Sequence, residues 1–230
     1  MKSHNSDEQP GAGLGSSSPG PQRGNAQHSN ASSTAPQRAE LERVAATAAF
    51  TALITVGAYL SFPLPGSPVP VVVQNFFVIA AGMLLGPRHG LAAVVVYLVL
   101  GAVGFPVFSG ASGGVAHLVG PTGGYLLGYL PAVFVAGALL SKRVRATGAV
   151  DATGAARAAG LGRTAAAAGL GFALVYLCGV PVLMLVTGLG LGPALAVGFL
   201  PFFPGDVLKA VAAVLLYRRV APRLNRWSRG

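Results

Sequence analysis

The sequence predicts an all-α membrane protein with six transmembrane helices. Of its 230 residues, 53% are hydrophobic and only 10% are charged, whereas a soluble domain usually carries about a quarter charged residues. The apolar residues form runs separated by Gly- and Pro-rich connections, and the basic residues cluster between alternate runs. A chain with so few charges cannot solvate a water-exposed surface, so we expect the lipid bilayer to be its solvent.

The apolar runs give the six expected spans. The first run is about as long as the roughly 20 residues that cross a hydrocarbon core, and the second and third are shorter because Gly86-Pro87 interrupts the chain between them. In the last run, prolines interrupt residues 193–203, so a continuous helix is expected only from about Asp206. The expected spans are 41–62, 71–85, 90–103, 123–140, 164–187 and 193–217.

Three parts of the chain differ in composition. Residues 1–38 are rich in Ser, Gly, Pro, Gln and Asn without an apolar run, which predicts a disordered polar tail. They also lack the apolar core of a signal peptide, so the first span should remain as an anchor. Residues 39–220 form the predicted transmembrane substrate-binding domain, and residues 221–230 a basic tail.

The distribution of Lys and Arg predicts the orientation. The connection 142–163 and the segment after residue 217 are basic, whereas the connections 63–70, 104–120 and 188–205 contain neither Lys nor Arg. By the positive-inside rule, both termini are cytoplasmic and the protein is a multi-pass protein of the plasma membrane. The same clustering argues against nucleic acid as a partner, despite a net charge of +10.

The connections without Lys or Arg are rich in apolar residues, unlike ordinary solvent-exposed loops. The connection around Phe105 reads Gly-Phe-Pro-Val-Phe-Ser-Gly, with further glycines after it. Irregular backbone at membrane depth is tolerated where it packs on protein or lines a cavity. We therefore expect extracellular lid loops over an outward-opening pocket; the alternative is a set of tight turns at the headgroup level.

Four polar residues lie within or beside apolar spans. Asp206 and Lys209 are spaced by three and so share one helix face. With Asp206 as the N-cap and Lys209 in the first turn, they would form a receptor for a carboxylate; the alternative is a structural ion pair. Gln74 and Asn75 are costly to leave unpaired in lipid, so they must face protein or ligand.

Glycines and a tyrosine introduce the fourth span. Thr122 and the backbone N–H groups of Gly123 and Gly124 could bind a polar ligand head, with Tyr125 as an aromatic wall. The Gly-x-x-x-Gly spacing that starts at Gly124 is equally well explained by close helix packing.

An enzymatic function is disfavoured. Gly-Ala-Ser112-Gly resembles the serine motif of rhomboid intramembrane proteases, but no histidine lies on spans four to six to act as its base. His117 is interpreted as a polar residue of the same loop. The chain contains no P-loop, and its one cysteine, Cys178, excludes an intrachain disulfide. We expect no catalytic residue, metal or cofactor.

Three motifs in order resemble the BioY family. They are Tyr97-Leu-Val-Leu-Gly-Ala-Val-Gly-Phe-Pro-Val-Phe-Ser-Gly, Gly120-Pro-Thr-Gly-Gly-Tyr and Pro204-Gly-Asp-x-x-Lys. Members of this family are biotin-binding capture subunits of energy-coupling factor (ECF) transporters. The resemblance covers about residues 41–217 and implies biotin as the ligand; a capture subunit for another small carboxylated vitamin is the alternative.

The resemblance also implies roles for individual residues. Asp206 and Lys209 match the charged pair of the biotin site, with Lys209 facing the valerate carboxylate, while Thr122–Tyr125, Phe105 and Gln74 match pocket or lid positions. Ala48 and Ala52 match a small-residue motif that contacts the transmembrane coupling subunit, which a pair of ATPase subunits powers. From the residues alone, this stripe is equally well explained by contacts within the chain.

Overall fold

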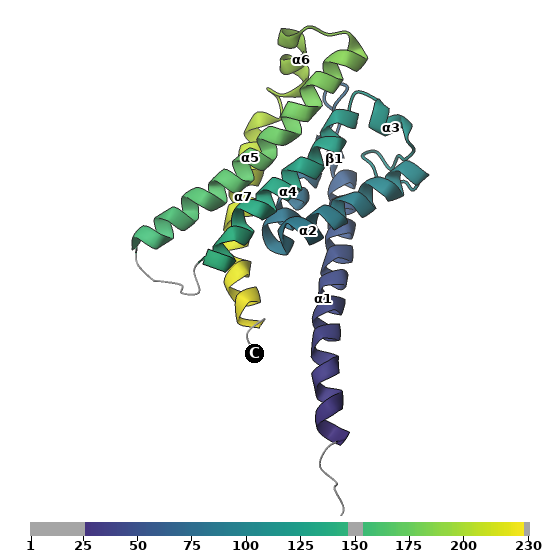
Figure 1. Cartoon of the computed structure of the whole chain (residues 1–230). Helices are drawn as coiled ribbons and strands as arrows, with labels where there is room; N and C mark the ends of the chain where they lie inside the picture. Colours follow the sequence, from purple (N-terminus) through teal and green to yellow (C-terminus); the bar gives the residue numbers. More distant parts are fainter. Residues whose placement is uncertain (1–25, 147–153, 228–230) are drawn as a thin grey trace, which may run out of the picture. The chain divides into compact units, whose positions relative to one another are not determined.

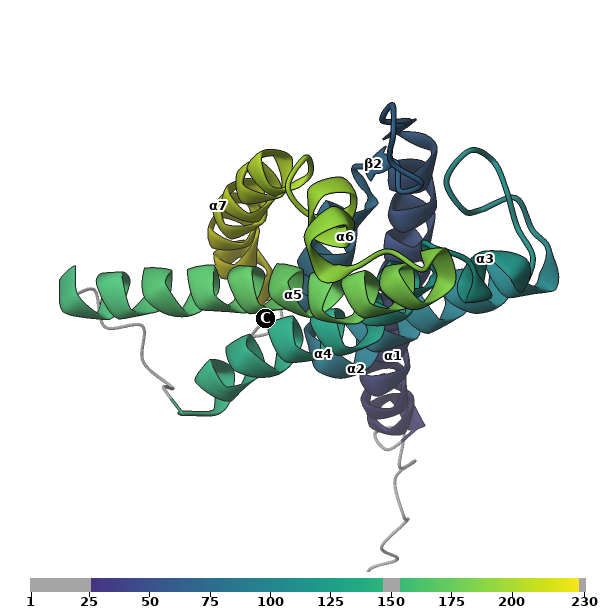
Figure 2. The same cartoon turned by 90° about the horizontal axis from the view of Figure 1, so that it is seen from above.

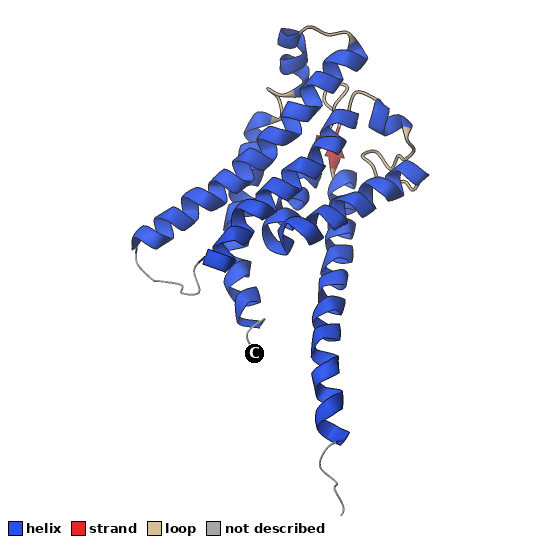
Figure 3. Cartoon of the chain, in the orientation of Figure 1, coloured by secondary structure: helices blue, strands red, loops and turns tan. Residues whose placement is uncertain are grey.

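The computed structural model describes residues 26–146 and 154–227, and these are mostly helical (Figures 1 and 3). The chain divides into two units, residues 1–39 and 40–230. In chain order the elements are α1 (Ala26–Tyr59), β1 (Ser61–Phe62), β2 (Val71–Val72), α2 (Gln74–Val103), α3 (Ala116–Val119), α4 (Gly123–Ala146), α5 (Gly154–Thr187), α6 (Leu191–Gly198) and α7 (Phe203–Trp227).

Helix α1 begins earlier than the composition predicts. Its first residue, Ala26, falls inside the segment 1–38 for which the sequence predicts disorder. Once a span has nucleated, adding a residue to its helix requires no further nucleation, so a helix can extend beyond its apolar part. Residues 1–25, and the seven residues 147–153 in the predicted basic connection, lie outside the described residues.

The helices have the length and composition of membrane spans. Four of them qualify as single spans: 40–59 of α1, α2, 123–140 of α4 and 160–187 of α5; α6 and α7, bent by 53° at their junction, qualify together as a fifth. Large apolar side chains such as Leu53, Val96 and Leu177 are exposed on the outside of the bundle. Lipid solvates such surfaces, which explains why they need no protein cover. The all-α membrane fold is therefore confirmed, while the count of six spans stays a prediction.

Helix α2 is broken where the sequence predicts, at Gly86-Pro87. Gly86 has φ 79° and ψ 179°, a conformation that a residue with a side chain rarely adopts. The break turns the chain back on itself: a Cβ built on Gly90 would lie 3.0 Å from the Cα of Gly82, a contact that a straight helix could not make across eight residues. The break therefore lies between the segments that the sequence predicts as the second and third spans.

Helix α4 lies between α2 and α5 and packs closely against both (Figures 1 and 2). Glycines permit these close crossings. A Cβ on Gly82 of α2 would lie 2.3 Å from the carbonyl oxygen of Val133, and one on Gly124 would lie 2.6 Å from that of Cys178. The Gly-x-x-x-Gly pattern thus serves helix packing.

Replacing Gly82 by alanine is expected to destabilise the protein by roughly 1–3 kcal/mol, because the new methyl group would collide with fixed backbone. Thermal unfolding in detergent or lipid nanodiscs measures this loss. Gly169→Ala in α5 is the matched control, since no atom lies within 4 Å of the Cβ it would add. Equal behaviour of the two variants would contradict the packing assigned to Gly82.

The connections at one end of the bundle are folded. Strands β1 and β2 form an antiparallel pair that closes residues 63–70 into a hairpin. The hydroxyl of Ser67 donates to the carbonyl of Val197 at 2.7 Å, and the hydroxyl of Tyr59 donates to the carbonyl of Pro106. These bonds tie the hairpin to α6, and α1 to the connection 104–115. The three connections without Lys or Arg are thus packed structures over the helix ends.

The start of α7 differs from the prediction. The helix begins at Phe203, so Asp206 lies within its first turn rather than at the N-cap, and Lys209 lies one turn later. The backbone N–H of Asp206 already donates to the carbonyl of Phe202 at 2.9 Å. Proline is tolerated in the first turn of a helix, where its missing N–H has no intrahelical partner to lose. Pro204-Gly205 therefore starts the helix instead of breaking it.

Candidate functional site

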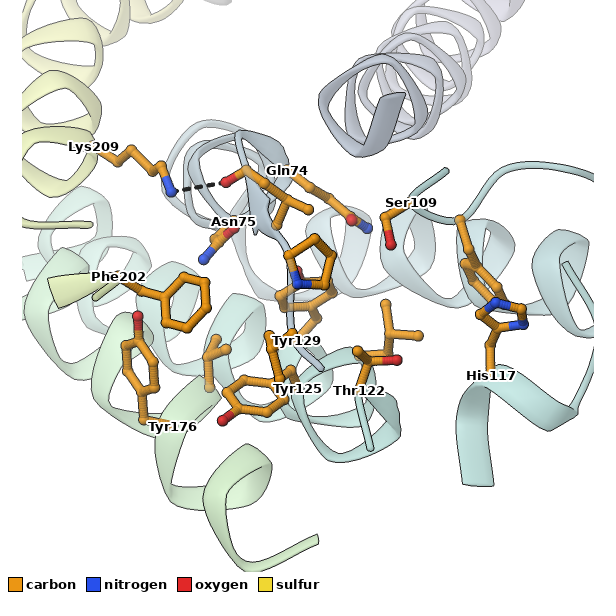
Figure 4. A pocket seen from close by; sticks show the side chains of 16 residues that line it. Gln74, Asn75, Ser109, His117, Thr122, Tyr125, Tyr129, Tyr176, Phe202 and Lys209 are labelled. Carbon is orange, nitrogen blue, oxygen red and sulfur yellow. Dashed lines mark hydrogen bonds between the residues drawn. The ribbon is translucent and has the colours of Figure 1, made fainter. Parts of the chain in front are cut away.

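A pocket lies beneath the folded connections, among the ends of α2, α4 and α7 and the side of α5 (Figure 4). The space between its lining atoms, with the open mouth included, is about 600 Å³. Its lining residues are Val69, Pro70, Val72, Gln74, Asn75, Phe108, Ser109, His117, Thr122, Tyr125, Leu126, Tyr129, Val175, Tyr176, Phe202 and Lys209.

Asp206 organises one end of this pocket without lining it. Its side chain is buried, with 4% of its surface exposed. One carboxylate oxygen accepts from Lys209 Nζ at 2.6 Å, the other accepts from the hydroxyl of Tyr176, and Asn75 Nδ2 lies 3.5 Å from both. All three donors do line the pocket. Asp206 therefore positions three pocket-lining side chains from three different helices.

Lys209 carries the charge that the pocket presents. Its ammonium donates to Asp206 and, at 2.8 Å, to the carbonyl of Val72 (Figure 4). An ammonium has three N–H donors, so one remains for a ligand. Of the described residues that line the pocket, Lys209 alone has a full charge. With the balancing carboxylate behind it, this end of the pocket is suited to an anionic group.

Aromatic residues form the wall next to this charged end. Tyr176 packs edge-on against Tyr125, with ring centroids 6.1 Å apart, and against Phe199 at 4.8 Å. The hydroxyl of Tyr125 donates to the carbonyl of Gly198 at 2.8 Å, which ties α4 to α6. Because that hydroxyl is occupied, Tyr125 offers its ring to a ligand, as the sequence predicts for an aromatic wall.

Three lining residues carry buried polar atoms that find no hydrogen-bond partner among the described residues. These atoms are Gln74 Nε2, Asn75 Oδ1 and His117 Nδ1. Gln74 is 2% exposed and Asn75 is 8% exposed. Unpaired polar atoms at this depth each cost about 1–3 kcal/mol, so they are available to a ligand or an ordered water that enters the pocket. The pocket thus has a charged end and a set of neutral hydrogen-bonding groups.

The structure brings most of the predicted site residues together. Gln74, Thr122, Tyr125 and Lys209 line the pocket, and Asp206 lies directly behind it. These residues are far apart in the sequence but close in space, because α2, α4 and α7 all begin at the same end of the bundle (Figure 1).

Three predicted positions are not at the pocket surface. Phe105 is 55% exposed and does not line the pocket; Phe108, which is 1% exposed, takes that place. The prediction from the sequence is Phe105 and does not include Phe108, three residues further on. Gly123 and Gly124 are buried by packing, and the N–H of Gly123 donates to the carbonyl of Gly120 at 3.0 Å. The N–H of Gly123 is therefore already paired, and neither glycine lines the pocket.

The other two sequence motifs lie apart from the pocket. Ala48 and Ala52 are exposed on α1, so the small-residue stripe has an open face. Ser112 donates its hydroxyl to the carbonyl of Ser109 at 2.7 Å, an arrangement that orders the loop and does not activate a nucleophile.

Sequence reasoning missed Tyr176, Tyr129, Phe108, Ser109 and His117 as lining residues. For the tyrosines there was a usable signal, because a hydroxyl on an apolar span needs a buried partner. His117 was interpreted as a polar loop residue, yet it lies on the one-turn helix α3 and faces the pocket.

The fold and the pocket together define the class of this protein: a polytopic helical membrane protein with a pocket that has one charged end. Comparison with known proteins then gives the family. The BioY family model matches residues 29–226, and the chain belongs to the BioY family.

Similar proteins cover most of the chain. A biotin transporter of the family from Thermotoga maritima is 40% identical over 171 residues, which is 74% of this chain and 90% of that protein. A second, from Rhizobium etli, is 40% identical over 177 residues, or 76% and 90% of the two chains. The crystal structure of the S-component for biotin from an ECF-type ABC transporter superposes with a TM-score of 0.70 at 30% identity, covering 80% of this chain and 93% of that one.

Proposed function

We propose that this protein captures biotin and serves as the substrate-specific subunit of an ECF-type transporter for biotin uptake. The observation that carries the proposal is the pocket with one ammonium at one end and unpaired neutral polar atoms elsewhere along its wall. Biotin has a matching shape: a carboxylate on a flexible apolar chain and a ring urea at the other end. The names of the related proteins support the same ligand.

In the proposed complex, the free N–H of Lys209 donates to the carboxylate of biotin, and Asp206 holds the ammonium in place from behind. The rings of Tyr125 and Tyr176 contact the apolar body of the ligand. Gln74 and Thr122 hydrogen-bond its neutral polar head. A fixed charge at one end and neutral groups at the other would orient the molecule in the pocket.

Coupling to transport requires partners. The exposed stripe of Ala48 and Ala52 on α1 is the proposed docking surface for a transmembrane coupling subunit, which a pair of ATPase subunits would drive. Small side chains permit close approach of a partner helix within the bilayer. The basic segments place both termini in the cytoplasm of the proposed topology, so that the pocket opens outward across the plasma membrane.

Calorimetric titration of the purified protein in lipid nanodiscs tests the ligand. We expect saturable binding of biotin at one site per chain. A competition panel of other small carboxylated vitamins should displace labelled biotin only at far higher concentrations. If another vitamin bound more tightly than biotin, that vitamin would be the assigned ligand. If neither biotin nor any of the other vitamins bound, the capture function would be refuted.

A further inference from the structure

A second hollow adjoins the pocket on the side of the loops. It opens more widely to the surface than the pocket and is formed by the hairpin, the connection 104–115 and α3. Its lining residues are Pro68, Pro70, Ser109, Ala116, His117, Gly120, Pro121 and Thr122. Four of these, Pro70, Ser109, His117 and Thr122, also line the pocket. We call these four residues the neck, because they border both spaces.

His117 is the neck residue that contacts a buried aromatic side chain. Its ring lies against Phe108, with centroids 5.8 Å apart and planes tilted by 42°. Phe108 is itself held edge-on against Tyr97 at 5.5 Å. In Figure 4 the imidazole lies at the opposite end of the pocket from Lys209. The half-buried ring of His117 thus packs on its inner side against a buried aromatic pair.

A histidine that merely belonged to a loop would turn its ring nitrogens to water. In this structure Nδ1 of His117 is buried and has no hydrogen-bond partner among the described residues. Such an arrangement is costly unless something else pairs with the nitrogen. Across the pocket, Nε2 of Gln74 is also unpaired, and Figure 4 shows that side chain extending toward Ser109. The end of the pocket remote from Lys209 therefore offers a donor and an imidazole nitrogen.

We propose that His117 is a ligand-contacting, specificity-determining residue whose Nδ1 accepts an N–H of the ring urea of biotin. This inference rests on the proposed function. A urea presents a carbonyl oxygen and N–H groups side by side, so the oxygen pairs with the donor Nε2 of Gln74 and one N–H pairs with Nδ1. The carboxylate then lies at Lys209, at the other end of the elongated pocket. A ligand without a hydrogen-bonding head leaves both groups unpaired and is rejected.

Measuring the affinities of two protein variants for modified ligands tests this contact. His117→Leu retains bulk at the neck and removes the nitrogen, and we expect it to weaken biotin binding roughly tenfold. The modified ligands are the two lactam analogues of biotin, each with one urea N–H replaced by CH2. For wild type, one of the two lactams should bind about tenfold more weakly than biotin. For His117→Leu, that same lactam and biotin should bind with similar affinity, because the contact that the lactam lacks is already absent from the variant. His89→Leu, a histidine of α2 outside the pocket lining, is the control and should bind like wild type.

The possible outcomes distinguish a failure of the proposed His117 contact from a failure of the proposed biotin-capture function. Unchanged biotin affinity of a folded His117→Leu, or equal losses for both lactams in wild type and variant, overturns the contact alone. If His117→Leu instead removes the discrimination between biotin and its carboxamide, the ligand lies the other way round and the assignment is wrong. If wild type does not bind biotin, both the function and the contact are refuted. Should His117→Leu fold poorly, His117→Gln, which keeps an acceptor, should restore the discrimination between the lactams.

Discussion

Replacement of Lys209 by methionine is expected to weaken biotin binding roughly a hundredfold, about 3 kcal/mol. Methionine keeps the length and apolar stem of lysine and removes the ammonium. The lost interaction is a charge-assisted hydrogen bond in a site where the lysine side chain is only 15% exposed, so water replaces it poorly. No other described residue that lines the pocket has a full charge to take its place.

The ligand provides the sharpest control for Lys209. Biotin carboxamide lacks the negative charge, so wild type should bind it much more weakly than biotin, and Lys209→Met should bind the two with similar affinity. Arg218→Met removes a positive charge from an exposed position of the same helix and should leave biotin affinity unchanged. A full preference for biotin over its carboxamide in Lys209→Met would show that the carboxylate does not lie at this residue.

Local sequence signals predicted several features correctly because each depends on residues close together in the chain. Gly86-Pro87 breaks α2, since glycine adopts the required positive φ and proline cannot continue the preceding hydrogen bonds. Asp206 and Lys209 form an ion pair, since a spacing of three places them on one helix face. The burial of Gln74 and Asn75 follows equally from the cost of exposing amides to lipid.

Features that depend on tertiary packing were not predictable in this way. The hydroxyl of Tyr176 meets the carboxylate of Asp206 only because α5 and α7 pack together. The choice between Phe105 and Phe108 as the pocket aromatic depends on how the connection 104–115 folds, including an isolated bridge between Phe108 and Ser112. His117 faces the pocket because α3 presents it there, and no periodic pattern marks a helix of a single turn.

Substitution of Asp206 by asparagine is expected to destabilise the protein by about 3 kcal/mol and to abolish tight biotin binding. The change preserves the shape of the side chain but leaves the ammonium of Lys209 without its anion in a buried site. It also weakens the acceptor that holds the hydroxyl of Tyr176 and the amide of Asn75. The loss is measured by thermal unfolding, with Glu42→Gln at an exposed position of α1 as the matched control.

A double variant separates the structural role of Asp206 from its effect on the ligand. In Asp206→Asn/Lys209→Met no unpaired charge remains, so much of the lost stability should return. Biotin affinity should not return, because the ammonium that contacts the carboxylate is absent. If the double variant were less stable than Asp206→Asn, the energetic cost would not arise from the uncompensated lysine. If it bound biotin like wild type, the pair would be structural only, and the charged end of the pocket would have no part in recognition.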